Sequence, residues 1–361
     1  MAYNSVARCR IFVDYLTLWH YYGLLEKYSS TTSVADNHPE WIGLNPTSIV
    51  NFTSTTGSEF RNWLSFELFN TTKLPDTVNM DNSKMFSAIL GHNLAESGTG
   101  FVSKELSIDD ATGAGEGFNV EGIVNVDDED GDNSENVKQN VPFNGYSIRM
   151  FDPAYLDING VHFMLQGIST ENPISIGSCA YGVAYTLPHS PDLSLSISYE
   201  TGTKTIETRG GSSLSNTIAT PPKWGDLAAW ELHDPFVGEN NLTPNPIPDQ
   251  SFARNSRRIY DLSFSFLDKT DTFPKYNALN RLADTSLSSD VINDTNEETI
   301  LDSDDFFSMV YNKVGTAHKF IFQPDTDVNE FAICKFDMNS FKFDQVANGV
   351  YNIKLKIREV W

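Results

Sequence analysis

The first residue to consider for chemistry is the histidine at position 92. His92 lies between Gly91 and Asn93, directly after the apolar run of residues 85–90. Because Gly and Asn tolerate left-handed backbone, the sequence predicts a tight corner at this point. An imidazole in such a corner can satisfy backbone groups, and no serine or cysteine of the chain stands in a nucleophile-elbow pattern. We therefore interpret His92 as a structural residue rather than a catalytic one.

The spacing of metal-ligating residues does not favour a transition-metal site. The seven histidines never occur at i and i+4, and the three cysteines (Cys9, Cys179 and Cys334) lie far apart. An odd number of distant cysteines also argues against a disulfide framework and fits synthesis in the cytoplasm.

The densest group of hard oxygen donors is the acidic run at residues 127–132. It contains four aspartates around a glycine: Asp127, Asp128, Asp130 and Asp132. Such a cluster could hold calcium. It does not follow the EF-hand pattern, because placing Gly131 at position 6 of the loop puts Val126 at position 1. We expect a solvated acidic loop, with calcium on these aspartates as the alternative.

The remaining patterns do not define an active site. The segment that contains Gly113, Gly115 and Gly117 has the glycines of a phosphate-binding loop but not its other features. Acids surround these glycines, and no lysine follows them. A carboxylate pair for glycoside hydrolysis cannot be singled out among 48 acids. We assign no catalytic and no cofactor-binding residue and expect a protein that is not an enzyme, with a hydrolase of cell-wall or capsule glycans as a lesser alternative.

The acidity of the chain is concentrated in two segments. The net charge is −23, and residues 105–137 and 282–312 hold 19 of the 48 acids without any Lys or Arg. The rest of the chain is nearly balanced, so there is no basic footprint for nucleic acid. No apolar run is long enough to span a membrane, and we expect no export signal, because Arg8, Arg10 and Asp14 interrupt the amino-terminal segment.

The elements that would position these residues are mainly strands. Residues 85–90 read as a strand buried on both faces, and strands are expected near residues 9–15, 60–69, 146–150, 161–168, 319–322, 331–336 and 351–357. Alternation predicts that Leu193, Leu195, Ile197 and Tyr199 share one buried face, and that Leu262, Phe264 and Phe266 point inward. Acids at residues 304–305 and Gly315 delimit a helix near 303–314.

The predicted fold class is mainly β. We divide the chain into an amino-terminal strand and aromatic arm (1–45), a jelly-roll-like antiparallel β-sandwich (46–168) with an acidic insertion (105–136), and a second antiparallel β-rich domain (169–361) with one or two short helices. The insertion should be a solvated surface excursion, because it offers few apolar groups to offset the entropy of ordering.

Four large aromatic residues lie within ten positions near the amino terminus: Trp19, Tyr21, Tyr22 and Tyr28. Aromatic side chains are common anchors of protein interfaces, so these four are candidate subunit contacts. Ordinary packing in the core of the chain is the alternative.

Three stretches of the chain resemble bacteriophage tail proteins. Residues 88–98, AILGHNLAESG, resemble a phrase in the galactose-binding-like (discoidin-type) jelly-roll modules of those proteins. Two further stretches occur in the same order as in that family. One is residues 7–16, and the other runs from residues 257–262 to residues 319–325. The resemblance covers most of the chain in outline and contains no active-site signature. The chain departs from the family at the acidic insertion after Phe101.

The resemblance implies a structural virion protein of a tailed bacteriophage. It would be a distal-tail-like component of the tail or baseplate, made in the host cytoplasm. Copies of the chain would form a homo-oligomeric, six-fold ring, and other virion tail proteins would be its partners. The alternative is a carbohydrate-binding adhesin or receptor-recognition protein of the virion, whose exposed aromatic side chains would contact host surface glycans.

Overall fold

The protein is mainly β and antiparallel, which confirms the predicted fold class. The computed structural model describes residues 7–30, 41–44, 50–52, 60–92, 100–107, 119–120, 145–152, 157–167, 174–193, 195–201, 203–217, 256–274, 303–328 and 330–360. All strand pairings among these residues are antiparallel. None of the helices they contain is long and apolar enough to cross a membrane.

The larger sheet has ten strands in the order β12-β15-β19-β17-β16-β1-β11-β5-β8, with β18 also paired to β19. Their bounds are β1 Arg10–Asp14, β5 Ser83–His92, β8 Gly145–Phe151, β11 Ser178–Thr186, β12 Ser196–Thr201, β15 Ser256–Asp268, β16 Phe320–Gln323, β17 Ala332–Phe336, β18 Phe343–Ala347 and β19 Val350–Glu359. Most of the predicted strands therefore belong to one sheet, and β18 is a strand that the sequence analysis did not predict.

The second sheet has five strands in the order β2-β4-β9-β6-β7. These are β2 Leu25–Ser30, β4 Phe60–Lys73, β6 Gly100–Ser107, β7 Asn119–Val120 and β9 Asp157–Gly167. Two further pairs join β3 (Val50–Phe52) to β10 (Ile174–Ile176) and β13 (Thr203–Glu207) to β14 (Ser213–Thr217). The helical segments are α1 Tyr15–Tyr21, η2 Thr77–Asn79, α3 Lys269–Thr272, η5 Phe307–Tyr311 and α5 Asn312–Val314.

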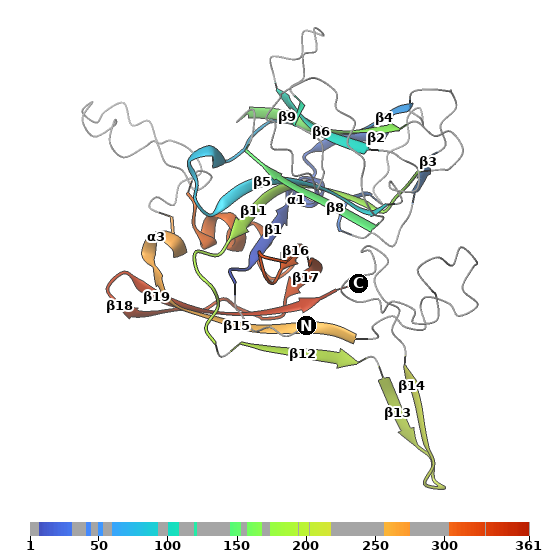
Figure 1. The fold of residues 1–361 in the computed structure, drawn as a ribbon, viewed down its shortest axis with the longest axis vertical. Helices are drawn as coiled ribbons and strands as arrows, with labels where there is room; N and C mark the ends of the chain where they lie inside the picture. The colour runs from blue at the N-terminus through green and yellow to red at the C-terminus, as the bar shows by residue number, and fades with distance from the viewer. Residues whose placement is uncertain are drawn as a thin grey trace.

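The sheets stack in layers, as Figure 1 shows. The five-stranded sheet lies above the β5–β8–β11 part of the larger sheet, and the β12–β15–β19 part lies below. Strand β5 is buried along almost all of its length, as its apolar sequence predicted. In the core, the Phe12 ring meets Phe86 edge-on at 5.1 Å between centroids and Phe331 at 5.8 Å. Strands from the start, middle and end of the chain thus share one core.

Strand β1 lies inside the larger sheet rather than in a separate arm. It pairs with β11 on one side and with β16 on the other. Because this sheet takes strands from all three predicted segments, the expected divisions at residues 45 and 168 do not separate one sheet from another. At the centre, a Cβ on Gly182 would lie 2.0 Å from the Val13 carbonyl oxygen, so glycine lets β11 approach β1 closely.

Two alternating patterns predicted more burial than the structure shows. Leu193 and Tyr199 are exposed rather than inward. Leu193 lies before β12, in a turn, and Tyr199 lies in β12, which is the last strand at its end of the sheet and pairs with β15 alone among the described strands. In β15, Leu262 and Phe264 are buried as expected, but Phe266 is 77% exposed. A β-bulge after Phe264 explains the difference, since it shifts the register so that Leu267 is the next buried residue.

The predicted helix near residues 303–314 is present in modified form. Asp305 caps it: the Ser308 backbone N–H donates to Asp305 Oδ1 at 2.8 Å, and the Ser308 hydroxyl donates to Oδ2 at 2.8 Å. Its middle turn, η5, is a π-helix, and Gly315 ends it at φ 53°. Phe306, Val310 and Val314 are buried, so this segment packs these side chains into the core.

Candidate interaction surface

Helix α1 positions the aromatic residues near the amino terminus, and Asp14 begins it. The Asp14 carboxylate accepts the backbone N–H groups of Leu16 (3.1 Å) and Thr17 (3.3 Å), and also the Thr17 hydroxyl. It accepts the Tyr181 backbone N–H as well, at 3.2 Å, and this bond ties the helix start to β11. Burial raises the pKa of Asp14 to about 6, and these hydrogen bonds oppose the rise.

The buried face of α1 contains Trp19, which was a candidate subunit contact. Trp19 is buried, with its ring 5.9 Å from Tyr15 and 6.1 Å from Tyr181. It therefore packs in the core of its own chain, as the alternative interpretation expected. The sequence pattern could not separate it from its exposed neighbours, because all are aromatic and only the helical period decides which side faces inward.

The other face of the helix end exposes two tyrosines. Tyr21 is 68% and Tyr22 64% exposed. Their rings meet edge-on at 5.2 Å, and Tyr21 meets the His318 ring edge-on at 4.8 Å. Burial and the charge of Lys335 lower the pKa of His318, which favours its neutral form. The contacts hold Tyr21 and Tyr22 in place at the surface.

Two further large apolar side chains are exposed, one just before β2 and one on β4. Leu25 and Leu68 pair across these strands and are buried, so their neighbours Leu24 and Phe69 point to the opposite, outer side. The Phe69 N–H donates to the Leu24 carbonyl oxygen at 3.0 Å, and Phe69 is 60% exposed. Neither residue was among the contact candidates predicted from the sequence, although the alternation of β4 indicates which of its side chains face outward.

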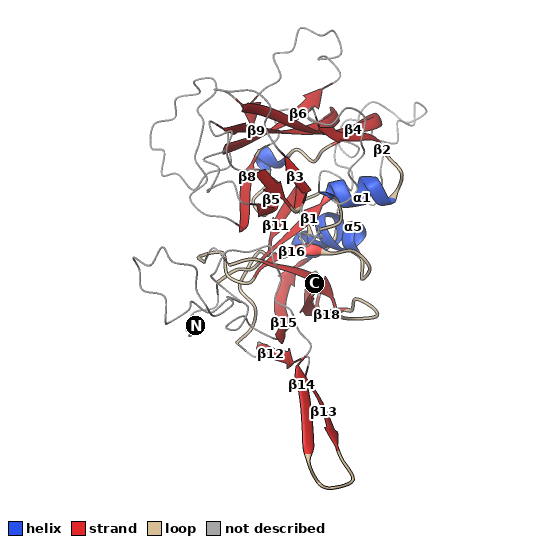
Figure 2. Ribbon diagram, turned by 90° about the vertical axis from the view of Figure 1, so that its right-hand side faces the viewer, coloured by secondary structure: helices blue, strands red, loops and turns tan. Residues whose placement is uncertain are grey.

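We call Tyr21, Tyr22, Leu24 and Phe69 the apolar patch. These four large side chains are exposed at or next to two rigid elements: the end of α1 and the first strand pair of the smaller sheet. Figure 2 shows α1 and β2 close together on the same side of the molecule. Exposed apolar patches of this kind are typical of interaction sites.

The other predicted site residues lie elsewhere or outside the described part of the chain. Tyr28 lies on β2, but its side chain is outside the described residues. The calcium candidates Asp127, Asp128, Asp130 and Asp132 are also outside them, as is most of the insertion at 105–136. Within the described ranges, no group of three or more His, Cys, Asp or Glu residues is arranged to hold a metal ion.

His92 occupies a buried position at the end of β5. Its Nε2 lies 2.9 Å from the Ser147 hydroxyl oxygen, across the pairing of β5 with β8. Gly91 has a φ of 64° and lies at a register irregularity between these strands, so the predicted tight corner is a bulge. The contact with Ser147 joins two strands of one sheet, in line with the structural interpretation.

The cysteines are poor nucleophile candidates. All three cysteines, Cys9, Cys179 and Cys334, are buried. Burial raises the pKa of Cys9 to about 12, and burial together with the nearby Asp14 carboxylate raises that of Cys179 further. The Cys9 and Cys179 thiols are therefore protonated at neutral pH and pack as small apolar groups.

A buried ion cluster joins β15 and β19 of the larger sheet to Glu330, a residue that precedes β17. The Arg258 guanidinium contacts Glu330 and donates from Nε to Glu359 Oε1 at 2.6 Å, and all three side chains are almost fully buried. The Arg258 backbone N–H also donates to Glu359 Oε2 at 2.6 Å. Because both acids contact the same cation inside the core, the cluster fixes β15 against β19 and supplies no open site.

Comparison with known proteins gives no family. No family model matches the chain, and no curated protein matches it. Among solved structures it is similar to CBM32-3 from a family 31 glycoside hydrolase of Clostridium perfringens, with 9% sequence identity and a TM-score of 0.28, over 44% of this chain and 91% of that chain. A TM-score this low assigns no ligand and no residue role to the present chain.

Proposed function

We propose that this protein is a structural subunit that assembles with copies of itself through the apolar patch. The single observation that carries the proposal is the exposure of Tyr21, Tyr22, Leu24 and Phe69 on rigid elements. Aromatic side chains with few rotatable bonds lose little entropy on contact, so they are the usual anchors of protein interfaces. The resemblance of residues 88–98 supports placing this subunit in the tail or baseplate of a tailed bacteriophage, as a ring.

The test measures the mass of the purified protein by light scattering, with electron microscopy to look for rings. Changing Tyr21→Ser together with Tyr22→Ser should weaken self-association at least tenfold, because interface aromatics contribute on the order of 2 kcal/mol each. Val78→Ser is the matched control, since Val78 is also exposed but lies on η2. If the wild-type chain is monomeric at high concentration, or the double variant assembles normally, the proposal is wrong.

Carbohydrate binding is the second candidate, because exposed tyrosine rings can stack on sugar rings. The ring geometry favours the protein contact instead. Tyr21 meets both Tyr22 and His318 nearly perpendicular, at 81° and 78°, so the three rings form no flat platform. Titration with a glycan panel distinguishes the candidates: saturable binding by the wild-type monomer, lost in the Tyr21→Ser, Tyr22→Ser variant, would support the sugar site.

A further inference from the structure

Basic side chains lie beside the apolar patch. The His318 ring lies 4.8 Å from the Tyr21 ring. Burial and the positive charge of Lys335 lower the pKa of both His318 and Lys319, so the three bases lie near one another, and each is partly exposed. No described carboxylate forms an ion pair with Lys319 or Lys335. Glu26 on β2 is an exposed acid near the other end of the patch. The tyrosine end therefore has positive charge that the described residues do not neutralise.

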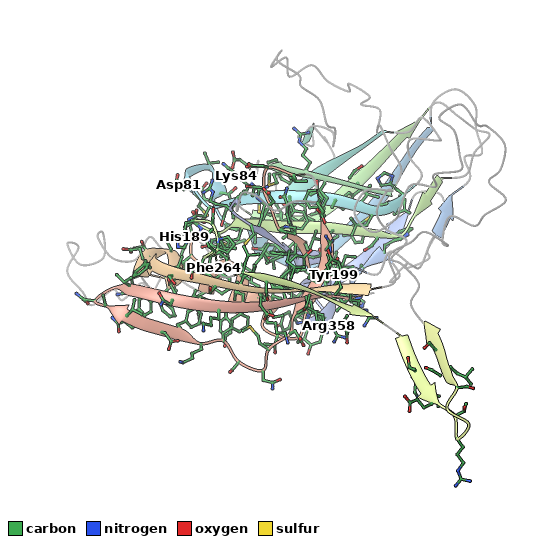
Figure 3. The ribbon with its side chains drawn as sticks, turned by 60° about the horizontal axis from the view of Figure 1, so that its bottom comes forward. Asp81, Lys84, His189, Tyr199, Phe264 and Arg358 are labelled. Atoms are coloured by element: carbon green, nitrogen blue, oxygen red, sulfur yellow. The ribbon has the colours of Figure 1, made fainter. Side chains whose placement is uncertain are left out.

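The two lysines belong to a row of bases across the larger sheet. Lys335 is directly opposite Arg358 in the pairing of β17 with β19, and the register of β16 with β17 places Lys319 opposite Lys335. Like charges opposite each other in a sheet are destabilising. Arg358, labelled in Figure 3, has its own counter-ion in Glu200 of β12. A partner that brings negative charge to the two lysines would relieve their repulsion.

One stretch of the chain joins an apolar run to an acidic one. Residues 123–126, IVNV, directly precede the acidic run of residues 127–132. Residues 121–136 contain seven acids and no Lys or Arg, whereas residues 282–302 never have more than two acids side by side. The apolar run is complementary to the apolar patch, and the acidic run is complementary to the lysines beside it.

The smaller sheet separates this stretch from the patch of its own chain. Val120, the last residue of β7, lies in the same row of the sheet as Ser30 of β2. Four strand spacings of ~4.8 Å lie between β7 and β2, and Leu24 precedes Ser30 by six residues, so Leu24 is roughly 27 Å from Val120. By the same spacings, Phe69 is roughly 20 Å from Val120. Residues 123 and 124 reach at most about 14 Å beyond Val120, so they cannot touch Leu24 or Phe69 of their own chain.

We propose that residues 123–132 of a second copy of this chain bind the apolar patch, with the IVNV run on the patch and the acidic run along Lys319 and Lys335. The inference rests on the proposed function and names what the patch binds. The stretch and the patch are two different surfaces of each chain, so the contact is head-to-tail. Repeated head-to-tail contacts close into a ring when the rotation permits. Salt should weaken the assembly, because exposed charges are screened.

The test exchanges the charges of the two surfaces in the full-length chain. The lysine variant carries Lys335→Glu, and the acidic variant carries Asp127→Lys with Asp128→Lys. Each should weaken self-association about tenfold in light scattering, because like charges then meet at the contact. A chain with all three substitutions should assemble nearly as well as the wild type, since the charges are complementary again. The matched control, Asp284→Lys with Asp290→Lys, changes the net charge equally and should assemble normally.

A peptide of residues 121–136 adds a direct measurement. It should bind the wild-type chain and block its assembly, and it should not bind the Tyr21→Ser, Tyr22→Ser variant. All samples contain a chelator, which keeps calcium off the aspartates, and thermal unfolding shows that each variant is folded. If the acidic variant assembles normally while the Tyr21→Ser, Tyr22→Ser variant does not, the patch functions with another partner and the inference is overturned. Failure of the triple variant to recover assembly also overturns it. A monomeric wild type instead overturns the proposed function itself.

Discussion

At the scale of single residues, Phe266 shows how a bulge overrides an alternating pattern. Its φ is 63°, and its N–H donates to Asn352 Oδ1 at 3.0 Å, where β15 has two residues opposite one residue of β19. Left-handed backbone costs an ordinary residue about 1–2 kcal/mol, which is why glycine usually occupies this position of a bulge. Sequence alternation alone could not locate the bulge, because Phe is atypical there.

Phe266→Gly should therefore be more stable than Phe266→Ala by about 1 kcal/mol in the free energy of unfolding, because only glycine relieves the backbone. Both variants remove the exposed ring, so their comparison isolates the conformational contribution. Urea unfolding of the two variants gives the difference. An alanine variant as stable as the glycine variant would show that the backbone at this position is not strained.

Asp14 gives a pH dependence whose sign is set by its raised pKa. With a pKa of about 6 in the folded state and an ordinary value near 4 in the unfolded state, Asp14 holds its proton more tightly when folded. The folded state is thus favoured fully below about pH 4, and this contribution is lost as the pH rises through about 6.

The Asp14→Asn variant cannot ionise, so the stability of the wild type relative to this variant should fall by roughly 3 kcal/mol between pH 4 and pH 7. Unfolding curves of both proteins at several pH values give the difference between their free energies of unfolding. The contributions of the other carboxylates are the same in both proteins and cancel in this difference. A constant difference across this range would mean that Asp14 has an ordinary pKa.

At the scale of elements, the pairing of β1 with β11 depends on Gly182. A side chain there would meet backbone atoms of β1, with the Val13 carbonyl oxygen 2.0 Å from the added Cβ and the Tyr15 nitrogen 2.9 Å away. Backbone atoms in the middle of a sheet cannot move aside without breaking ladder hydrogen bonds, so the space cannot be made locally.

Gly182→Ala should destabilise the protein by at least 1–3 kcal/mol, the usual range for overpacking a core. Gly210→Ala is the control: no atom lies within 4 Å of its added Cβ, and it should leave the melting temperature nearly unchanged. Equal melting temperatures for both variants would contradict the close approach.

The strands were easier to predict from sequence than their arrangement. Apolar runs and period-two alternation located β5, β9, β15 and β19, because these patterns report local burial. They did not reveal that β1 pairs with β16, since contacts between residues more than 300 positions apart leave no local signal. For the candidate site, composition indicated Tyr21 and Tyr22, whereas Leu24 and Phe69 depended on which side of β2 and β4 faces the core.

At the scale of the whole molecule, two segments of similar length have opposite importance for the fold. Residues 203–217 form the projecting hairpin, whereas residues 7–16 include β1 in the middle of the larger sheet. The amino-terminal segment is therefore not a detachable arm, and an interface there is better studied by substitution at Tyr21 and Tyr22 than by deletion.

Replacing residues 203–217 with a short Gly-Ser linker should leave the circular dichroism β-rich and the melting temperature within a few degrees, because the hairpin contributes little to the core. Removing residues 1–14 should abolish cooperative unfolding, since it leaves β11 and β16 without their shared neighbour. Thermal scans of both variants test this contrast, and a stable protein without residues 1–14 would refute it.

The central place of β1 also has a consequence for how the protein is made. Arg10 Nη1 donates to Gln323 Oε1 at 3.0 Å, across 313 residues of sequence. Ribosomes add about 5–20 residues per second, so β1 emerges roughly 15–60 s before β16, one of its two partner strands. The strands of the smaller sheet, between residues 25 and 167, are complete long before that. Strand β11 can cover one edge of β1 once residue 186 is made, whereas the other edge lacks β16 until translation is nearly complete. A chaperone that shields this open edge until release would raise the yield of native protein.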